Sequence, residues 1–165
     1  MALREITDFQ ERGFEGFVRV SDLIGSNCCE IPEVPGVYCV LRLNATPPKF
    51  LEKSIGGHFK GKDPTVAIHL LKHKWISDAV VLNVGKAGGN GDSSLKSRIK
   101  QYMLFGQGKR VGHRGGRYIW QLHDSQDLIL CWKPTPGLIP RDVEKALIRN
   151  FEETYQGLPF ANLRH

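Results

Sequence analysis

Two short apolar runs separated by a polar stretch most constrain what this chain can fold into. Residues 37–43 and 79–84 are rich in β-branched and aromatic side chains, with Pro35 and Gly36 before the first run and Gly85 after the second. Apolar runs of this length, bounded by turn residues, are typical of buried strands. The sequence therefore predicts two core strands whose connection is unusually long.

That connection, residues 44–79, reads as an insertion with a helix of its own. Asp63 and Pro64 offer N-cap and first-turn chemistry to a helix over residues 65–77. The apolar positions of this segment fit a helical period, and they are Ala67, Ile68, Leu70, Leu71 and Trp75. An insertion between two strands costs little, because loop-closure entropy grows only logarithmically with loop length.

The second half of the chain alternates between helix and strand signals. Asp92, Ser93 and Ser94 are candidate N-caps for a helix over 94–105, and a last helix is expected over 140–155. Residues 116–124 and 127–134 read as one or two further strands. We therefore expect one domain over 1–165 of the α/β (α+β) class. Its small, mainly antiparallel central sheet would have about three strands flanked by helices, and residues 1–34 form an N-terminal extension of unassigned periodicity.

Positive charge is concentrated in one stretch. The chain has 23 Lys and Arg against 17 Asp and Glu, a formal net charge of +6. Residues 86–117 hold eight of these cations and one acid, Asp92, interleaved with glycines that leave backbone N–H groups accessible. Such a stretch is suited to phosphate groups. The expected nucleic-acid contacts are Lys96, Lys100, Lys109, Arg110, His113, Arg114 and Arg117.

Several classes of protein are excluded or disfavoured. No apolar run approaches the roughly 18 residues of a membrane span, so we expect a cytoplasmic protein without a membrane partner. The four cysteines are irregularly spaced, which predicts reduced and mostly buried thiols. His69 and His73 lie four residues apart, but a third ligand in a suitable context is missing, so no zinc site is expected.

A set of polar side chains recurs in otherwise apolar segments, and its chemistry suits phosphodiester hydrolysis. Glu144 offers a hard oxygen ligand for one Mg²⁺ or Mn²⁺, and Arg98 offers a planar donor fork to a phosphate. Tyr38 would orient or deprotonate the attacking water, helped by Lys86, whose charge lowers the pKa of a neighbouring phenol. His113 is a reserve proton carrier.

The order and context of these residues resemble the GIY-YIG endonucleases. Residues 36–38, Gly-Val-Tyr, match the first motif of that family, and residues 83–86, Asn-Val-Gly-Lys, match the second. Arg98 matches the family arginine, Glu144 the metal-binding glutamate and Asn162 the asparagine near the end. The chain looks most like the small, stand-alone bacterial members. The resemblance implies a GIY-YIG-like fold and a metal-dependent endonuclease acting on DNA, including branched or damaged sites, with RNA not excluded.

This sequence departs from the family pattern at two places. The insertion at 44–79 replaces the short spacing between the two motifs, and Asn83 stands where the family has the second tyrosine. An amide cannot act as a base of the phenolate kind, although it can hydrogen-bond a water or a phosphate. Asn83 therefore joins Tyr38, Lys86, Arg98, Glu144 and Asn162 as a candidate catalytic residue.

Other functions remain open at this point. A nucleic-acid-binding module weakened in catalysis by Asn83 is the main alternative, and a protein-interaction domain with an acidic partner is the weaker one. Single residues also have structural explanations. Tyr38 could be a core tyrosine, Glu144 could pair with Arg141 in a first helical turn, and Asn162 could be a turn residue. The sequence does not give the oligomeric state.

Overall fold

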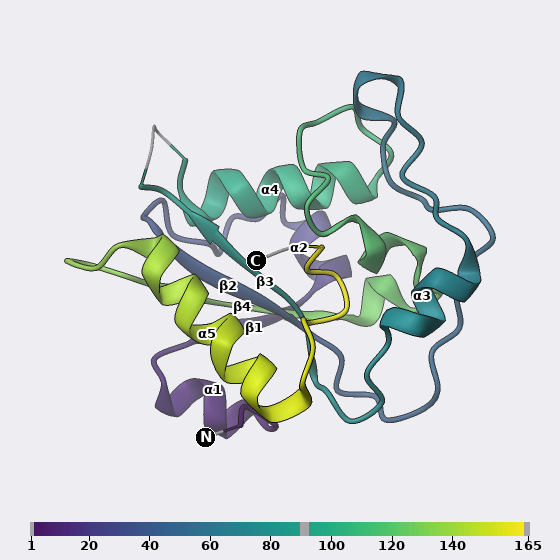
Figure 1. The fold of residues 1–165 in the computed structure, drawn as a ribbon. Helices are drawn as coiled ribbons and strands as arrows, with labels where there is room; N and C mark the ends of the chain where they lie inside the picture. Colours follow the sequence, from purple (N-terminus) through teal and green to yellow (C-terminus); the bar gives the residue numbers. More distant parts are fainter. Residues whose placement is uncertain (1, 90–92, 164–165) are drawn as a thin grey trace.

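The computed structural model describes residues 2–89 and 93–163 and is built around one open antiparallel sheet (Figure 1). Its four strands lie in the order β1-β4-β2-β3, and every pair is antiparallel. The described chain therefore has the α+β architecture that the sequence predicts, with one strand more than expected. The strands are β1 (Glu15–Arg19), β2 (Gly36–Leu41), β3 (Val81–Ala87) and β4 (Ile129–Pro134).

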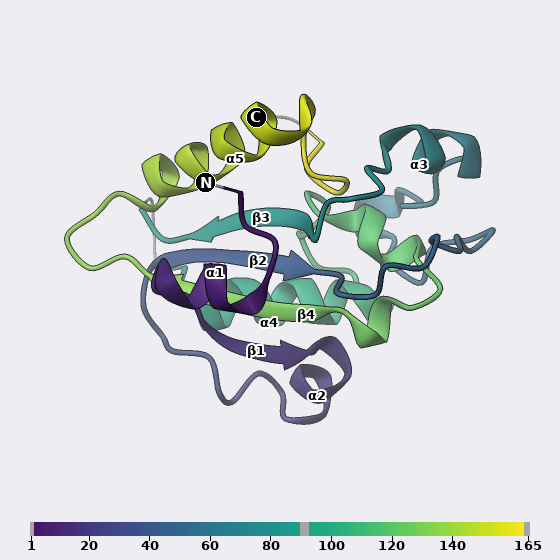
Figure 2. The same ribbon diagram turned by 90° about the horizontal axis from the view of Figure 1, so that it is seen from below.

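Helices cover both faces of this sheet: Figure 2 looks onto one face, with the strands side by side, α1 in front of them and α4 behind. One face carries α1 (Ile6–Glu11) and α5 (Pro140–Tyr155), and the other carries α2 (Val20–Gly25) and α4 (Leu95–Gly106). A fifth helix, α3 (Ile68–Lys74), lies in the insertion beyond the end of the sheet (Figure 1). The remaining helical turns are of the 3₁₀ type, and they are η1 (Phe59–Gly61), η2 (Arg117–Gln121) and η3 (Ser125–Asp127).

The central strand β2 is buried along its whole length and serves both layers. Val37, Cys39 and Leu41 pack in the cluster that includes α5 residues. Tyr38 and Val40 pack in the cluster that includes α4 residues. This alternation follows from the period of two along a strand, and it directs Tyr38 toward α4.

The strands differ from the sequence prediction at two places. The strand β1 lies in the N-terminal extension and pairs with β4. Its register shifts between Gly16 and Val18, and Phe17 has a φ of 57°, so a bulge interrupts the alternation that would have revealed the strand. Residues 116–124 form the 3₁₀ turn η2 and the segment after it, so only the 127–134 prediction is confirmed as a strand.

The helix predictions hold, with changed boundaries for α3 and α4. The α4 helix begins after Ser94, whose hydroxyl accepts from the Ser97 backbone N–H at 3.1 Å, while Asp92 lies outside the described residues. The insertion helix α3 is shorter than the predicted 65–77. Leu70, expected on its apolar face, is 48% exposed, and Leu71 is buried. The α5 helix has the bounds that the sequence predicts.

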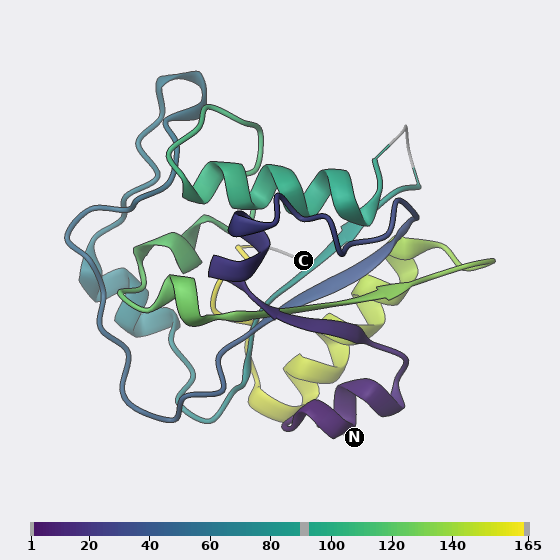
Figure 3. The same cartoon turned by 180° about the vertical axis from the view of Figure 1, so that it is seen from behind.

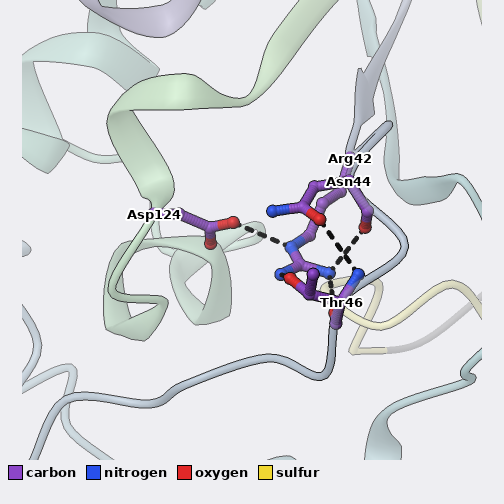
Figure 4. Close-up of polar contacts among 4 residues, drawn as sticks. All are labelled: Arg42, Asn44, Thr46 and Asp124. Atoms are coloured by element: carbon purple, nitrogen blue, oxygen red, sulfur yellow. Dashed lines mark hydrogen bonds and ion pairs between the residues drawn. The ribbon is translucent and has the colours of Figure 1, made fainter.

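A buried arginine fastens the start of the insertion (Figure 4). Arg42 follows β2 directly and is 8% exposed. Its Nε donates to the Asp124 carboxylate at 2.9 Å, and its Nη1 donates to the carbonyls of Asn44 at 2.9 Å and Thr46 at 2.7 Å. One guanidinium therefore ties the strand end, the insertion and the turn before β4 together.

Replacing Arg42 with methionine should destabilise the fold by about 2–3 kcal/mol. Breaking a buried ion pair typically costs about 3–5 kcal/mol because one charge loses its partner, and here the Asp124 side chain is 22% exposed, which lessens the cost. Urea denaturation measures the change. An Arg42→Met, Asp124→Leu double variant should recover part of the loss, and equal stability of wild type and single variant would contradict this role.

Three of the four cysteines are buried and all four are free thiols, as the sequence predicts. No helix in the described part of the chain is both long and apolar enough to cross a membrane.

Candidate functional site

The residues predicted to be catalytic line one open pocket of about 760 Å³. Its walls come from β2, β3, the first turns of α4 and α5, the segment after α4 and the C-terminal segment. The antiparallel β2 and β3 strands place Tyr38 directly opposite Gly85. Every candidate catalytic residue lies on this pocket, although five separate segments supply them: Tyr38, Asn83, Lys86, Arg98, Glu144 and Asn162.

The ring of Tyr38 lies in a space that only glycine leaves open. A Cβ atom at Gly85 would be 2.2 Å from Cζ of Tyr38, so a larger residue there would displace the ring. The hydroxyl of Tyr38 is 3.1 Å from Nε2 of His113. Tyr38 is therefore a buried tyrosine with a polar partner, but that partner is another titratable group facing the same pocket.

The electrostatics of Tyr38 differ from the prediction. Burial raises the pKa of its phenol above the ordinary value, and Glu144 raises it further. The cation that opposes this rise in the pKa is Arg98, and not Lys86 as predicted. Tyr38 is thus a neutral phenol at neutral pH, able to donate one hydrogen bond and accept another.

A second tyrosine, Tyr102, positions His113. The ring of Tyr102 stacks on the imidazole with centroids 4.1 Å apart and planes at 13°. Its hydroxyl donates to the Gly116 carbonyl at 2.8 Å and accepts from Nδ2 of Asn83 at 3.1 Å. Asn83 therefore supports the Tyr102 ring. Tyr102 lies four residues after Arg98 on one helix face, and that spacing was the available signal.

His113 differs from the basic residues with which the sequence grouped it. It is 2% exposed, so it cannot join an exposed phosphate-binding surface, although it lines the pocket. Burial lowers the pKa of His113 to about 3, and the charge of Arg98 lowers it as well. The imidazole is therefore neutral at neutral pH, and a neutral nitrogen facing a hydroxyl can accept its proton.

This buried imidazole predicts a pH-dependent stability. An unfolded histidine binds a proton near pH 6.5, whereas His113 in the fold does so only near pH 3. Between these values the unfolded state holds the extra proton, so stability falls as pH falls, by about 1.4 kcal/mol per pH unit. Relative to His113→Gln, wild type should lose about 1.5 kcal/mol between pH 6.5 and pH 5 in urea denaturation. A constant difference would contradict the neutral assignment.

Arg98 projects from α4 into the pocket and is held by neutral oxygens. Its Nη1 donates to the Gly112 carbonyl at 3.2 Å and to Oε1 of Gln101 at 3.3 Å. Neither partner carries a negative charge, so the guanidinium keeps its full charge for an anionic ligand. Its field reaches both Tyr38 and His113, as the causes of their pKa shifts show.

Glu144, in the first turns of α5, is the single carboxylate among the described residues that line the pocket. Burial raises its pKa, and the nearby charges of Lys86 and Arg141 lower it. No group of three or more His, Cys, Asp or Glu side chains suited to a metal occurs within residues 2–89 and 93–163. One carboxylate still fits Mg²⁺, which keeps several waters and takes few protein ligands.

Asn162 has a structural role that explains its place near the chain end. Its Oδ1 accepts from the Val84 N–H at 2.8 Å, and its Nδ2 donates to the Val84 carbonyl at 3.0 Å. The amide thus pairs with the β3 edge as a strand residue would and holds the C-terminal segment against the pocket. The predicted catalytic role of Asn162 has no separate support in these contacts.

The predicted nucleic-acid contacts divide between different faces. Arg114 and Arg117 line the pocket, and Lys109 and Arg110 are exposed on the loop after α4. Lys96 and Lys100 lie on the side of α4 near Cys28, away from Ser97, Arg98 and Gln101, which line the pocket. Positions two residues apart on a helix point in nearly opposite directions. Counting the charges along the sequence therefore overestimated the number of cations that face the pocket.

Comparisons with models of known protein families, with curated proteins and with solved structures gave no match to this chain.

Proposed function

We propose that this chain is a metal-dependent endonuclease of the GIY-YIG type that hydrolyses DNA phosphodiester bonds in this pocket. One observation carries the proposal: Tyr38, Lys86, Arg98 and Glu144 come from four separate elements and line one pocket. The order of these residues along the chain and the Gly-Val-Tyr strand support the GIY-YIG assignment. The open pocket and its small extent suit a branched or damaged site better than long sequence readout.

Positive charge in the pocket binds the phosphodiester. Arg98, Arg114, Arg117 and Lys86 line it together with a single acid among the described residues. The charge of Arg98 acts on both Tyr38 and His113. Its planar fork suits a phosphate whose negative charge grows in the transition state.

Tyr38 and His113 move the proton of the attacking water. Tyr38 is a neutral phenol, so it accepts a hydrogen bond from the water on its oxygen while it donates to Nε2 of His113. As the water attacks, its proton passes to the tyrosine oxygen and the tyrosine proton passes to His113. A phosphodiester bound at Arg98 offsets the charge that lowers the pKa of His113, so substrate strengthens this base.

Glu144 would hold Mg²⁺ or Mn²⁺ in the pocket. When bound, the ion supplies positive charge that stabilises the leaving oxygen. Burial raises the pKa of Glu144, and the charges of Lys86 and Arg141 oppose this rise and so favour the ionised form that binds a cation. Lys86 thus acts on the glutamate and not on the phenol.

One observation favours a second function, a nucleic-acid-binding module without turnover. Asn83 stands in place of the second family tyrosine, and its amide donates to Tyr102, so it does not substitute directly for a base. In this case the pocket would keep its positive charge and bind nucleic acid without cutting it.

Cleavage of three polymers tests the proposal against this alternative. Supercoiled plasmid, a branched DNA junction and single-stranded RNA are incubated with wild-type protein and Mg²⁺ or Mn²⁺, with and without chelator. The endonuclease function predicts metal-dependent cutting of DNA, and the faster-cut of the two DNA substrates identifies the preferred DNA structure. Salt-sensitive binding with no cutting of any polymer would favour the binding module. Cutting of RNA alone would correct the substrate class.

A further inference from the structure

We propose that the insertion supplies a second nucleic-acid contact, which holds the phosphate backbone beside the pocket. The contact is the cationic loop, residues 53–62, which carries Lys53, Lys60 and Lys62. The inference rests on the proposed function, because it requires a nucleic acid whose scissile bond lies in the pocket. It gives a role to a segment that otherwise only lengthens the connection between β2 and β3.

The cationic loop is built onto the end of α4 and the segment that follows it. The Gly57 N–H donates to the Phe105 carbonyl at 2.9 Å. A Cβ atom at Gly57 would be 1.9 Å from the Lys109 carbonyl oxygen, so the two backbones lie in contact. Both views of the fold show the two segments side by side above α4 (Figure 1 and Figure 3). The loop is therefore a fixed part of the fold at this place.

One arginine joins the cationic loop to the pocket. Arg114 lines the pocket, and its Nη1 donates to the Lys62 carbonyl at 3.0 Å. The segment that carries Arg114 also contains His113, which contacts the Tyr38 hydroxyl, and Gly112, whose carbonyl accepts a hydrogen bond from Arg98. Residues 107–116 thus contact the catalytic pocket on one side and the cationic loop on the other. A strand that enters the pocket at Arg98 can continue along this segment to the loop.

The charge along this path is strongly positive. Lys60 and Lys62 are exposed on the cationic loop, and Lys109 and Arg110 are exposed on the segment that packs against this loop. Residues 107–117 hold no acid, and one acid adjoins each end of the cationic loop, Glu52 before it and Asp63 after it. Lys60 has a φ of 55°, and its Nζ lies 5.4 Å from the centre of the Phe59 ring. A left-handed lysine in an ordered turn is an unfavourable conformation that persists mostly where the surrounding structure fixes it.

A nucleic acid suits this surface better than an acidic protein does. Arg114 joins the cationic loop to the pocket, so the lysines of the loop and the arginines of the pocket belong to adjoining surfaces. Successive phosphates of a polynucleotide can contact cations on both surfaces. The pocket itself offers a planar guanidinium to a phosphate. The partner is therefore the polynucleotide backbone flanking the scissile bond.

Salt-dependent binding tests the proposal. Affinity for a duplex of about two helical turns is measured with chelator by fluorescence anisotropy, in a Glu144→Gln background that prevents turnover. Lys60→Glu, Lys62→Glu should bind about tenfold more weakly, with a salt slope shallower by about 2, since each phosphate contact contributes about 0.9. Lys60→Gln, Lys62→Gln should give a smaller loss of affinity. The control is Arg4→Glu, Arg149→Glu, which makes the same charge change on exposed residues of the N-terminal segment and α5.

The result that would overturn the proposal is equal affinity and slope in the cationic-loop variant and the control. Loss of polyglutamate binding with duplex binding unchanged would overturn it too, by assigning the loop to an acidic protein. A separate assay tests the proposed endonuclease function independently of the cationic loop. A small phosphodiester, bis(p-nitrophenyl) phosphate, reaches the pocket without the loop, so its hydrolysis should be unchanged by the Lys60 and Lys62 substitutions. Absence of this hydrolysis in wild type would count against the endonuclease, while the binding data decide on the loop.

Discussion

Replacing Glu144 with glutamine should abolish cleavage while leaving nucleic-acid binding nearly intact. The substitution keeps the size of the side chain and removes the single carboxylate among the described residues of the pocket. Without that charge, the several kcal/mol that a bound ion contributes to the transition state are lost, which lowers kcat by about 10³-fold. The dissociation constant should change by less than about threefold, because the pocket cations remain.

The control for this variant is Glu153→Gln, an exposed glutamate on the same helix. It should cleave as wild type does. Normal cleavage by Glu144→Gln would show that the metal assignment is wrong, and loss of binding together with cleavage would place Glu144 in the fold of the pocket instead of its chemistry.

Replacing Arg98 with alanine should lower kcat by about 10²–10³-fold, the usual cost of removing a donor aimed at the transition-state charge. Affinity should fall only a few-fold, because other pocket cations still bind the phosphate. Arg98→Lys should restore little of the rate, since an ammonium lacks the planar fork. Equal losses of rate and affinity would reduce Arg98 to a phosphate anchor.

A second readout separates this role from a general loss of structure. The charge of Arg98 lowers the pKa of His113, so that pKa should rise in Arg98→Ala. An NMR titration of the His113 imidazole measures the change without substrate or metal. The matched control is Arg110→Ala, which removes an exposed cation from the loop after α4. This variant should weaken binding slightly and leave the pKa of His113 unchanged.

Local sequence signals predicted much of the fold. Periodicity and caps indicated β2, β3, β4, α4 and α5, because each of these elements is regular and bounded by turn residues. The strand β1 was missed because its bulge at Phe17 breaks the alternation. Residues 117–121 were mistaken for a strand because an apolar, aromatic run buried in a 3₁₀ turn has the same composition as a strand.

The site was predictable where residue type and order carried the information. Tyr38, Lys86, Arg98 and Glu144 do meet in one pocket. The pairing of Tyr38 with His113 joins residues 75 positions apart, so no local pattern contains it. The electrostatics were also out of reach, because burial sets the pKa of both groups and burial depends on the whole fold. For the same reason the sequence assigned the effect of Lys86 to the phenol instead of Glu144.

The most direct test of a hydrolytic pocket is one time course of supercoiled plasmid cleavage. Wild-type protein with Mg²⁺ or Mn²⁺, wild-type protein with chelator, and Glu144→Gln with metal are followed side by side. The proposed function predicts nicking in the first reaction alone. Equal nicking by wild type and Glu144→Gln, or nicking that persists in chelator, would contradict it.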